Sequence, residues 1–314
     1  MARMTIDQLQ IFLAVAQHLH FTRAAEELYI TQPSVSAAIQ SLEEQYGVKV
    51  FNRVGRRIEL TLAGKMLQVE AQKILTQVEL TERGLRELND LKRGELKLGA
   101  SQTIGNYWLP HLISLFKQEY PNISVDCTLD NTTEISEGTV TGLFDLSLVE
   151  GEVEPSVLAS LEQQIVSGDC LQIVVGKSHA WFEKMAVEVT ELTNTAWVMR
   201  EKGSGTRQQF EQVLRQWGIE ATQLNVILEM KSGDMVKAAV ESGVGAAAIS
   251  NLIITKELRL DMLGCIQVTG LAKDTTEVDS LSRPFFLLKH QERFQTRISQ
   301  VFEQLLVSAR SWHI

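Results

Sequence analysis

The chain has 314 residues, which at roughly 100 to 200 residues per domain corresponds to two or three folded units. Apolar residues make up 44% of the chain and charged residues 22%, a composition that excludes a disordered or fibrous protein. No apolar run approaches the roughly 20 residues that cross a bilayer, so we expect a cytoplasmic protein without a membrane segment. The cysteines lie too far apart in the sequence for a zinc motif, and we expect neither a metal nor a cofactor.

The net charge of -9 is unevenly distributed. Residues 1–65 contain seven Lys/Arg and six Asp/Glu and so carry +1, whereas the remainder carries -10. Five of these basic residues fall within 49–65, beside the single acid Glu59. Local positive charge on an otherwise acidic chain favours contact with DNA phosphates at one place and disfavours non-specific coating of nucleic acid.

Three helices are expected near the amino terminus. Thr5 and Gln8 have the spacing of a capping box, and apolar residues at helical spacing follow them. Thr22 is expected to cap a second helix. A third helix begins at Thr31, has a proline in its first turn and ends at Gly47.

The third helix has an apolar face and a polar face. Val35, Ile39 and Leu42 recur at helical spacing, so short polar side chains such as that of Gln32 are left toward solvent. Such side chains can enter a DNA major groove, where glutamine reads adenine. The segment 48–60 then reads as two short strands that turn at a glycine, which predicts a wing rich in arginine. A polar face that is only solvated is the alternative.

The same elements carry a family resemblance. The positions involved are Ala24, Ala25, Leu28, Thr31, Gln32, Pro33, Ser34, Val35, Ser36, Ile39, Leu42, Glu43, Gly47, Val50, Phe51, Arg53, Leu60, Thr61 and Gly64. Together they resemble the winged helix-turn-helix of LysR-type transcriptional regulators, although Val50 stands where that family usually has leucine. The resemblance implies that the start of the third helix meets the DNA groove and that wing arginines lie near phosphates. The implied DNA-binding residues are Thr31, Gln32, Pro33, Ser34, Ser36, Ala37, Arg53, Arg56 and Arg57.

A heptad repeat follows the wing. Apolar residues recur every seven positions from Leu60, or four positions after these, while most charged residues lie off this stripe. We therefore expect a linker helix that pairs with a second copy of the chain, and the resemblance implies a homodimer or homotetramer on a two-fold symmetric DNA site. Packing against its own chain is the alternative. The residues expected at the dimer seam are Leu67, Ile74, Val78, Leu85 and Leu88.

Strands and helices alternate after Gly94, which is the pattern of an α/β fold. This part resembles the effector domain of the same family, which is similar to type 2 periplasmic binding proteins and has two lobes. Strands are expected at residues 96–100, 123–129, 144–149, 171–176, 197–200, 226–230, 246–250 and 284–288. The expected division is a winged helix-turn-helix DNA-binding domain at 1–65, a linker helix at 66–92 and an effector domain at 93–314, with lobe I at 93–165 and 270–314 and lobe II at 166–269.

Two strand-to-helix junctions fit a small anion. The segments 99–106 and 203–207 both place hydroxyl groups at a helix start, where backbone N–H groups are unpaired. On opposite lobes they predict an oxyanion or carboxylate between the lobes, whereas hydroxyls that only cap the helices are the alternative. The segment 99–107 resembles the family branch that regulates sulfur assimilation and carbon fixation, which implies sulfite or a related anion. The predicted effector-binding residues are Ser101, Gln102, Thr103, Glu150, Ser204, Thr206 and Arg207.

The combined interpretation is a DNA-binding, effector-responsive transcription factor and not an enzyme. The segment 243–248 matches GxGxxA, but it follows a helix and enters a strand, the reverse of a dinucleotide-binding turn. The sequence has no P-loop, GxSxG or HExxH motif. The expected partners are double-stranded DNA, a small anionic effector and further copies of the chain. A solute-binding-protein-like sensor without a DNA role is the alternative, but it leaves the first 92 residues unexplained.

Overall fold

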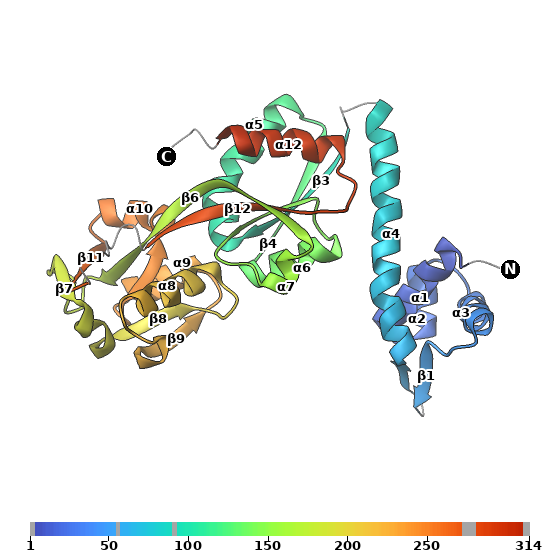
Figure 1. Ribbon diagram of the computed structural model, residues 1–314, viewed down its shortest axis with the longest axis horizontal. Helices are drawn as coiled ribbons and strands as arrows, with labels where there is room; N and C mark the ends of the chain where they lie inside the picture. The colour runs from blue at the N-terminus through green and yellow to red at the C-terminus, as the bar shows by residue number, and fades with distance from the viewer. Residues whose placement is uncertain (1–3, 55–56, 90–92, 272–280, 310–314) are drawn as a thin grey trace. The chain divides into compact units, whose positions relative to one another are not determined.

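The computed structural model describes residues 4–54, 57–89, 93–271 and 281–309. The chain divides into two compact units, Met1–Arg86 and Glu87–Ile314 (Figure 1). Within these described ranges, no helix is both long enough and apolar enough to pass through a bilayer.

The first unit begins with three helices. The capping box predicted for the first helix is confirmed, because the Thr5 hydroxyl accepts from the Gln8 N–H at 3.2 Å and the Gln8 amide oxygen accepts from the Thr5 N–H at 3.0 Å. The predicted cap of the second helix is wrong: His20 is the N-cap, its Nδ1 accepts from the Arg23 N–H at 3.4 Å, and Thr22 lies within the first turn. The helices are α1 (Ile6–His18), α2 (Phe21–Glu27) and α3 (Gln32–Tyr46).

A small wing follows α3. Strands β1 (Phe51–Val54) and β2 (Arg57–Leu60) pair antiparallel, and their turn lies outside the described residues. Glu43 of α3 is buried; its carboxylate accepts from the Val50 N–H at 3.0 Å and pairs with Lys49 at 2.6 Å. These contacts fix the entry of the wing against α3.

The long helix α4 (Leu62–Asn89) has two apolar surfaces. Leu67 and Ala71 are buried in the core of the first unit, together with Phe12 of α1. Leu62 and Met66 are instead exposed. Part of the predicted heptad stripe is therefore used within the chain's own fold.

The second unit is built on an eight-stranded sheet with the order β4-β3-β5-β12-β6-β11-β7; β10 also pairs with β6, and β8 pairs with β9 in a separate sheet. The three strands β3, β4 and β5 are parallel, whereas β12 runs antiparallel to β5 and β6. The strands are β3 (Gly94–Ser101), β4 (Ile123–Asp130), β5 (Leu146–Glu150), β6 (Leu161–Gly176), β7 (Ala186–Glu188), β8 (Ala196–Arg200), β9 (Asn225–Met230), β10 (Ala247–Ser250), β11 (Leu263–Thr269) and β12 (Ser282–His290). The helical segments are η1 (Ile104–Trp108), α5 (Leu109–Glu119), α6 (Thr132–Thr141), α7 (Pro155–Leu158), η2 (Val189–Asn194), α8 (Gly205–Gln216), η3 (Ala221–Gln223), α9 (Gly233–Glu241), α10 (Asn251–Arg259) and α12 (Arg297–Ser308).

Strand β6 is shared by two lobes. Residues 161–170 pair with β12, and residues 171–176 pair with β10 and β11. We call the part around β3, β4, β5 and β12 lobe I, and the part around β7 to β11 lobe II (Figure 1). The sequence predicted a strand only from 171; residues 161–170 are rich in polar side chains, and their extended conformation is instead supported by hydrogen bonds to β12.

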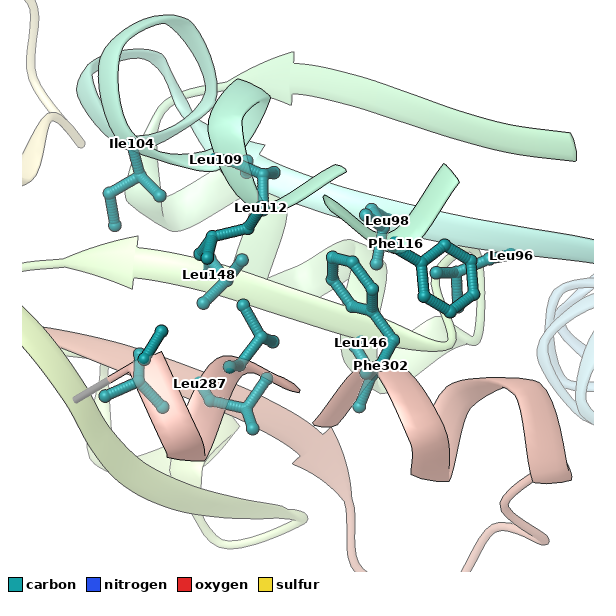
Figure 2. Packing of buried hydrophobic residues seen from close by; sticks show 14 of the residues in the cluster. Leu96, Leu98, Ile104, Leu109, Leu112, Phe116, Leu146, Leu148, Leu287 and Phe302 are labelled. Atoms are coloured by element: carbon teal, nitrogen blue, oxygen red, sulfur yellow. The ribbon is translucent and has the colours of Figure 1, made fainter. Parts of the chain in front are cut away.

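Each lobe has its own apolar core. In lobe I, leucines of β3 and β5 lie under α5 and α12, and the rings of Phe116 and Phe302 meet edge to face at 5.1 Å (Figure 2). In lobe II, the buried Trp197 lies against Phe210 with ring centroids 5.1 Å apart. These cores support the ends of β3, β5 and β8, where the predicted effector residues lie.

Candidate functional site

The start of α3 presents a polar surface. The Thr31 hydroxyl caps the helix by accepting from the Ser34 N–H at 3.3 Å, and the Gln32 amide donates to the Ser36 hydroxyl at 2.7 Å. Thr31, Gln32, Pro33, Ser34 and Ala37 are exposed and Ser36 is half-buried, while the apolar side of the helix is buried. The predicted base-reading residues therefore share one accessible surface.

The wing lies beside this surface. A hollow of about 460 Å³ separates α3 from the wing and is lined by Gln40, Lys49 and Asn52, among others. Arg57 is exposed at the start of β2. The predicted Arg56 and the side chain of Arg53 lie outside the described residues.

The residues predicted at a dimer seam on α4 differ in exposure. Ile74 and Leu85 are exposed, with 42% and 61% of the residue surface accessible, and Val78 is half-buried. Leu67 is buried against the chain's own first unit, and the side chain of Leu88 lies outside the described part. The own-chain alternative therefore holds for Leu67, while Ile74 and Leu85 remain accessible to a partner.

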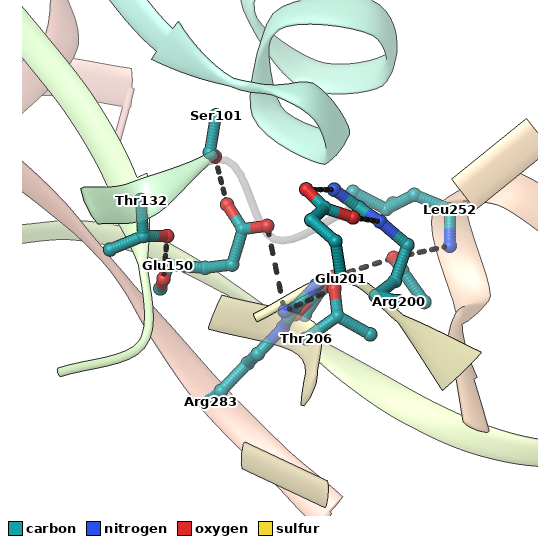
Figure 3. Close-up of polar contacts among 10 residues, drawn as sticks. Ser101, Thr132, Glu150, Arg200, Glu201, Thr206, Leu252 and Arg283 are labelled. Carbon is teal, nitrogen blue, oxygen red and sulfur yellow. Dashed lines mark hydrogen bonds and ion pairs between the residues drawn. The ribbon is translucent and has the colours of Figure 1, made fainter. Parts of the chain in front are cut away.

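Three of the predicted effector residues, Ser101, Glu150 and Thr206, meet in a buried polar group between the lobes, which we call the inter-lobe cluster. It combines the ends of β3, β5 and β8 with the starts of α8 and β12 and the middle of β6 (Figure 3). Its members are Ser101, Glu150, Asp169, Arg200, Glu201, Thr206 and Arg283.

Glu150 is at the centre of the inter-lobe cluster. Its carboxylate accepts from the Ser101 hydroxyl, and Arg283 Nη1 lies 3.6 Å from its other oxygen (Figure 3). The side chain is 2% exposed, and burial raises the pKa of the Glu150 carboxyl, an effect that Arg283 and Ser101 partly oppose. Glu150 lies deep within the cluster and not at a rim.

Arg283 joins the two lobes. It donates from Nε and Nη2 to the Asp169 carboxylate at 2.6 and 2.8 Å, and from Nη1 to the Thr206 hydroxyl at 3.0 Å. Asp169 also accepts from the Ser250 hydroxyl at 2.5 Å. Nearby carboxylates raise the pKa of Arg283, so this buried guanidinium stays charged.

Two predicted hydroxyls are buried without a partner among the described residues. Thr103 and Ser204 are each 1% exposed, and neither Oγ atom has a hydrogen-bond partner. Ser204 occupies the N-cap of α8 but its hydroxyl does not cap the helix. A buried hydroxyl without a hydrogen bond is disfavoured, so the alternative that these groups are only caps does not describe them.

The other predicted effector residues are engaged elsewhere. Gln102 is half-buried and its amide oxygen lies 3.5 Å from the Asn106 amide nitrogen. Arg207 donates to Glu211 at 2.7 Å, to Glu229 at 2.5 Å and to the carbonyl oxygen of Arg200 at 3.0 Å. The cations of the inter-lobe cluster are therefore Arg200 and Arg283 and not Arg207.

Sequence reasoning missed four charged members of the cluster, namely Asp169, Arg200, Glu201 and Arg283. Arg200 ends β8 and pairs with the adjacent Glu201 through two bonds of 2.8 and 2.9 Å, whereas Asp169 and Arg283 come from strands 114 positions apart. Each is a charged residue within or at the end of an apolar or extended segment. Such a placement indicates a buried charge that needs a partner, and this pattern in the sequence could have pointed to these residues. Their pairing depends on the register of β6 against β12, which the sequence pattern does not specify.

The lobes touch beside the cluster. The Thr133 N–H donates to the Gly203 carbonyl oxygen at 3.3 Å, and the Tyr107 hydroxyl donates to the Asp234 carboxylate at 2.5 Å. A Cβ atom at Gly205 would overlap the Glu150 carbonyl oxygen, so only glycine allows α8 to approach β5 this closely.

Family models match both units. The model for the bacterial regulatory helix-turn-helix protein, lysR family, matches residues 6–65, and the model for the LysR substrate binding domain matches residues 89–311. A relative from Trichormus variabilis, described as a probable RuBisCO transcriptional regulator, is 33% identical over 300 residues, covering 96% of this chain and 87% of the relative.

Solved structures share the fold. Full-length CbnR complexed with its target DNA has a TM-score of 0.69 at 19% identity, covering 98% of this chain and 100% of that one. The CcmR regulatory domain of Synechocystis PCC6803 in complex with 2-PG has a TM-score of 0.60 at 23% identity, covering 70% of this chain and 98% of that one. With a DNA-binding unit and an effector domain that both match the family models, the chain belongs to the LysR family of DNA-binding transcriptional regulators, which are not enzymes.

Proposed function

We propose that the chain is a homo-oligomeric regulator of carbon-fixation genes whose DNA binding responds to a small oxyanion held between the lobes, by the hydroxyls of Thr103 and Ser204 and the adjoining inter-lobe cluster. The observation that carries the effector site is the pair of buried, unpartnered hydroxyls of Thr103 and Ser204, on opposite lobes. Both follow the carboxyl end of a strand and stand at a helix start, where hydroxyl and N–H groups converge on anions. Relatives that are described as probable RuBisCO transcriptional regulators support the assignment to carbon-fixation genes.

The effector is proposed to be a metabolite with a phosphate, sulfonate or carboxylate group. The CcmR domain binds 2-PG, and the sequence resemblance suggests sulfite; both are oxyanions. A ligand that accepts hydrogen bonds from Thr103 and Ser204 would satisfy both hydroxyls and link the lobes. Because it contacts both lobes only when they are close, it would favour the closed arrangement.

A thermal-shift panel of sulfite, sulfate, phosphate and 2-PG tests the effector site. The anion that stabilises the wild type should give no shift in the Thr103→Val, Ser204→Ala double variant, because both hydroxyl donors are lost. Thr141→Val, which removes an exposed hydroxyl on α6, is the matched control and should keep the shift. An equal shift in the double variant and the wild type would place the site elsewhere.

For DNA recognition, we propose that Gln32 reads a base at the start of α3 and that exposed residues around it fix the helix in the groove. Gln32→Ala should remove the sequence-specific footprint on a promoter fragment that the wild type protects, while leaving the oligomeric state unchanged. Gln45→Ala, at the other end of the same helix, is the control and should keep the footprint. A footprint retained by Gln32→Ala would contradict this assignment.

A further inference from the structure

The inter-lobe cluster contains three carboxyl groups but only two guanidinium groups. Arg283 is matched with Asp169 through two hydrogen bonds of 2.6 and 2.8 Å. Arg200 is matched with Glu201 through two bonds of 2.8 and 2.9 Å. Glu150 has no guanidinium of its own among these residues, because its nearest cation, at 3.6 Å, is the Arg283 group already bound to Asp169.

This imbalance conflicts with the binding of an anion. The side chains of Glu150, Asp169 and Arg283 are 2%, 0% and 0% exposed, so water screens their charges weakly. A second negative charge beside the ionised Glu150 would be repelled, and a carboxylate offers the anion only acceptor atoms. A protonated Glu150 would remove the excess charge and present an O–H donor.

We propose that the oxyanion enters the inter-lobe cluster together with one proton, which Glu150 takes up from solvent to become a neutral carboxylic acid. The proposal rests on the effector site proposed above and adds its regulation: the regulator reads anion concentration and proton concentration jointly. The anion keeps its charge, the proton forms an O–H bond on a Glu150 oxygen, and no other bond is made or broken. The Ser101 hydroxyl, no longer needed by a carboxylate, becomes available to the anion.

The groups around Glu150 are consistent with protonation. The charged groups that face it are Arg283 from β12, Asp169 from β6 and Arg200 from β8. From β3 it receives the Ser101 hydroxyl, and from α6 the Thr132 hydroxyl donates to its backbone carbonyl at 2.7 Å. Burial is the largest influence, and it raises the pKa of the Glu150 carboxyl.

Titration calorimetry tests the proposal on the full chain, with sulfate, sulfite, phosphate and 2-PG as probes. Each probe is titrated into the wild type and into Glu150→Gln in two buffers of different ionisation enthalpy, which gives the number of protons taken up per anion. The wild type should take up about one proton more per bound anion than the variant. As pH rises, the affinity of the wild type for the anion should therefore fall faster than that of the variant, by an additional factor of up to about ten per pH unit. Because the probe itself titrates equally in both experiments, the difference between wild type and variant gives the proton uptake that depends on Glu150. Glu137→Gln, an exposed carboxylate of α6, is the matched control and should behave as the wild type.

Infrared difference spectra of the wild type give a readout that does not depend on the variant's fold. Adding the bound anion should produce the carbonyl band of a newly neutral carboxylic acid, and no such band would contradict the proposal. Equal proton uptake in the wild type and Glu150→Gln would also overturn it, while the effector site itself would stand. If none of the four anions binds to either protein, the proposed effector class fails and this inference fails with it.

Discussion

Glu150 couples pH to stability even without a ligand. Its ordinary pKa is 4.5, and burial raises the pKa in the folded protein, so the folded state holds the proton more tightly than the unfolded chain does. Stability from this group is therefore fully present below pH 4.5 and is lost as pH rises through the higher pKa of the folded state. The loss amounts to at most about 1.4 kcal/mol per pH unit over that window.

Glu150→Gln should remove this dependence because glutamine does not titrate. In urea unfolding at several pH values, the free energy of unfolding of the variant should exceed that of the wild type by a margin that grows as pH rises above 4.5. Glu137→Gln supplies the comparison, since that side chain is exposed. Parallel pH profiles for wild type and Glu150→Gln would show that Glu150 has the same pKa in both states.

At the level of single residues, the sequence indicated the hydroxyl groups of the site and Glu150, but not the other charged members of the inter-lobe cluster. The hydroxyls of Ser101, Thr103 and Ser204 stand directly at strand-to-helix junctions, a local pattern that a single segment carries. Arg283 and Asp169 meet only because β12 lies beside β6 in one register. Such pairing is a property of the tertiary structure, and the spacing of residues within either strand does not predict it.

At the level of elements, α4 is the element whose outer surface remains without a partner in the described chain. Leu62, Met66 and Val69 are exposed together with the heptad positions Ile74 and Leu85. Exposed apolar residues along one helix favour association with another copy. The own-chain packing of Leu67 supports the base of α4 and leaves this outer surface for pairing.

Ile74→Glu combined with Leu85→Glu should therefore lower the mass measured by analytical ultracentrifugation below that of the wild type. The charges would be placed on the pairing surface but not in the core of either unit, so the circular dichroism spectrum should be retained. Gln72→Glu adds a charge to α4 off the heptad stripe and should leave the mass unchanged. A double variant that sediments as the wild type would exclude Ile74 and Leu85 from the interface.

Most elements followed from local signals, and the exceptions share a cause. The N-cap Thr31, the C-cap Gly47 and the capping box at Thr5 are all present as predicted. The first half of β6 and strand β11 were not predicted, because polar residues interrupt the apolar positions of both segments, which owe their extended conformation to the strands with which they pair. Helix α10 was also not predicted, although its sequence contains three consecutive apolar residues.

At the level of the whole effector unit, Tyr107 and Asp234 form a direct polar contact between the lobes. The 2.5 Å hydrogen bond joins η1 of lobe I to α9 of lobe II. Burial raises the pKa of Tyr107 above its ordinary value, and the adjacent Asp234 carboxylate raises it further, so the hydroxyl remains a donor. η1 begins one residue after Thr103, so the effector residues and this contact share one short stretch of chain.

Tyr107→Phe keeps the ring and removes the donor. The free energy of unfolding should fall by about 0.5 to 1.5 kcal/mol, because water can reach the exposed Asp234 carboxylate, and amide hydrogens in the first turn of α9 should exchange faster. Tyr120→Phe removes a phenol hydroxyl within lobe I, where the ring stacks on Phe116, and should leave exchange in α9 unchanged. Unchanged exchange in Tyr107→Phe would mean that the contact does not hold the lobes together.

The continuous strand β6 limits how the two lobes can move. Because one backbone serves both, sliding of one lobe past the other would break the strand's ladders, and the remaining freedom is bending or twisting where its partner changes, between Cys170 and Leu171. Asp169 lies next to this pivot and holds both Arg283 and Ser250. One charged member of the inter-lobe cluster therefore stands within two peptide units of the pivot, so an anion bound at the proposed site would act on the bending point without a separate relay.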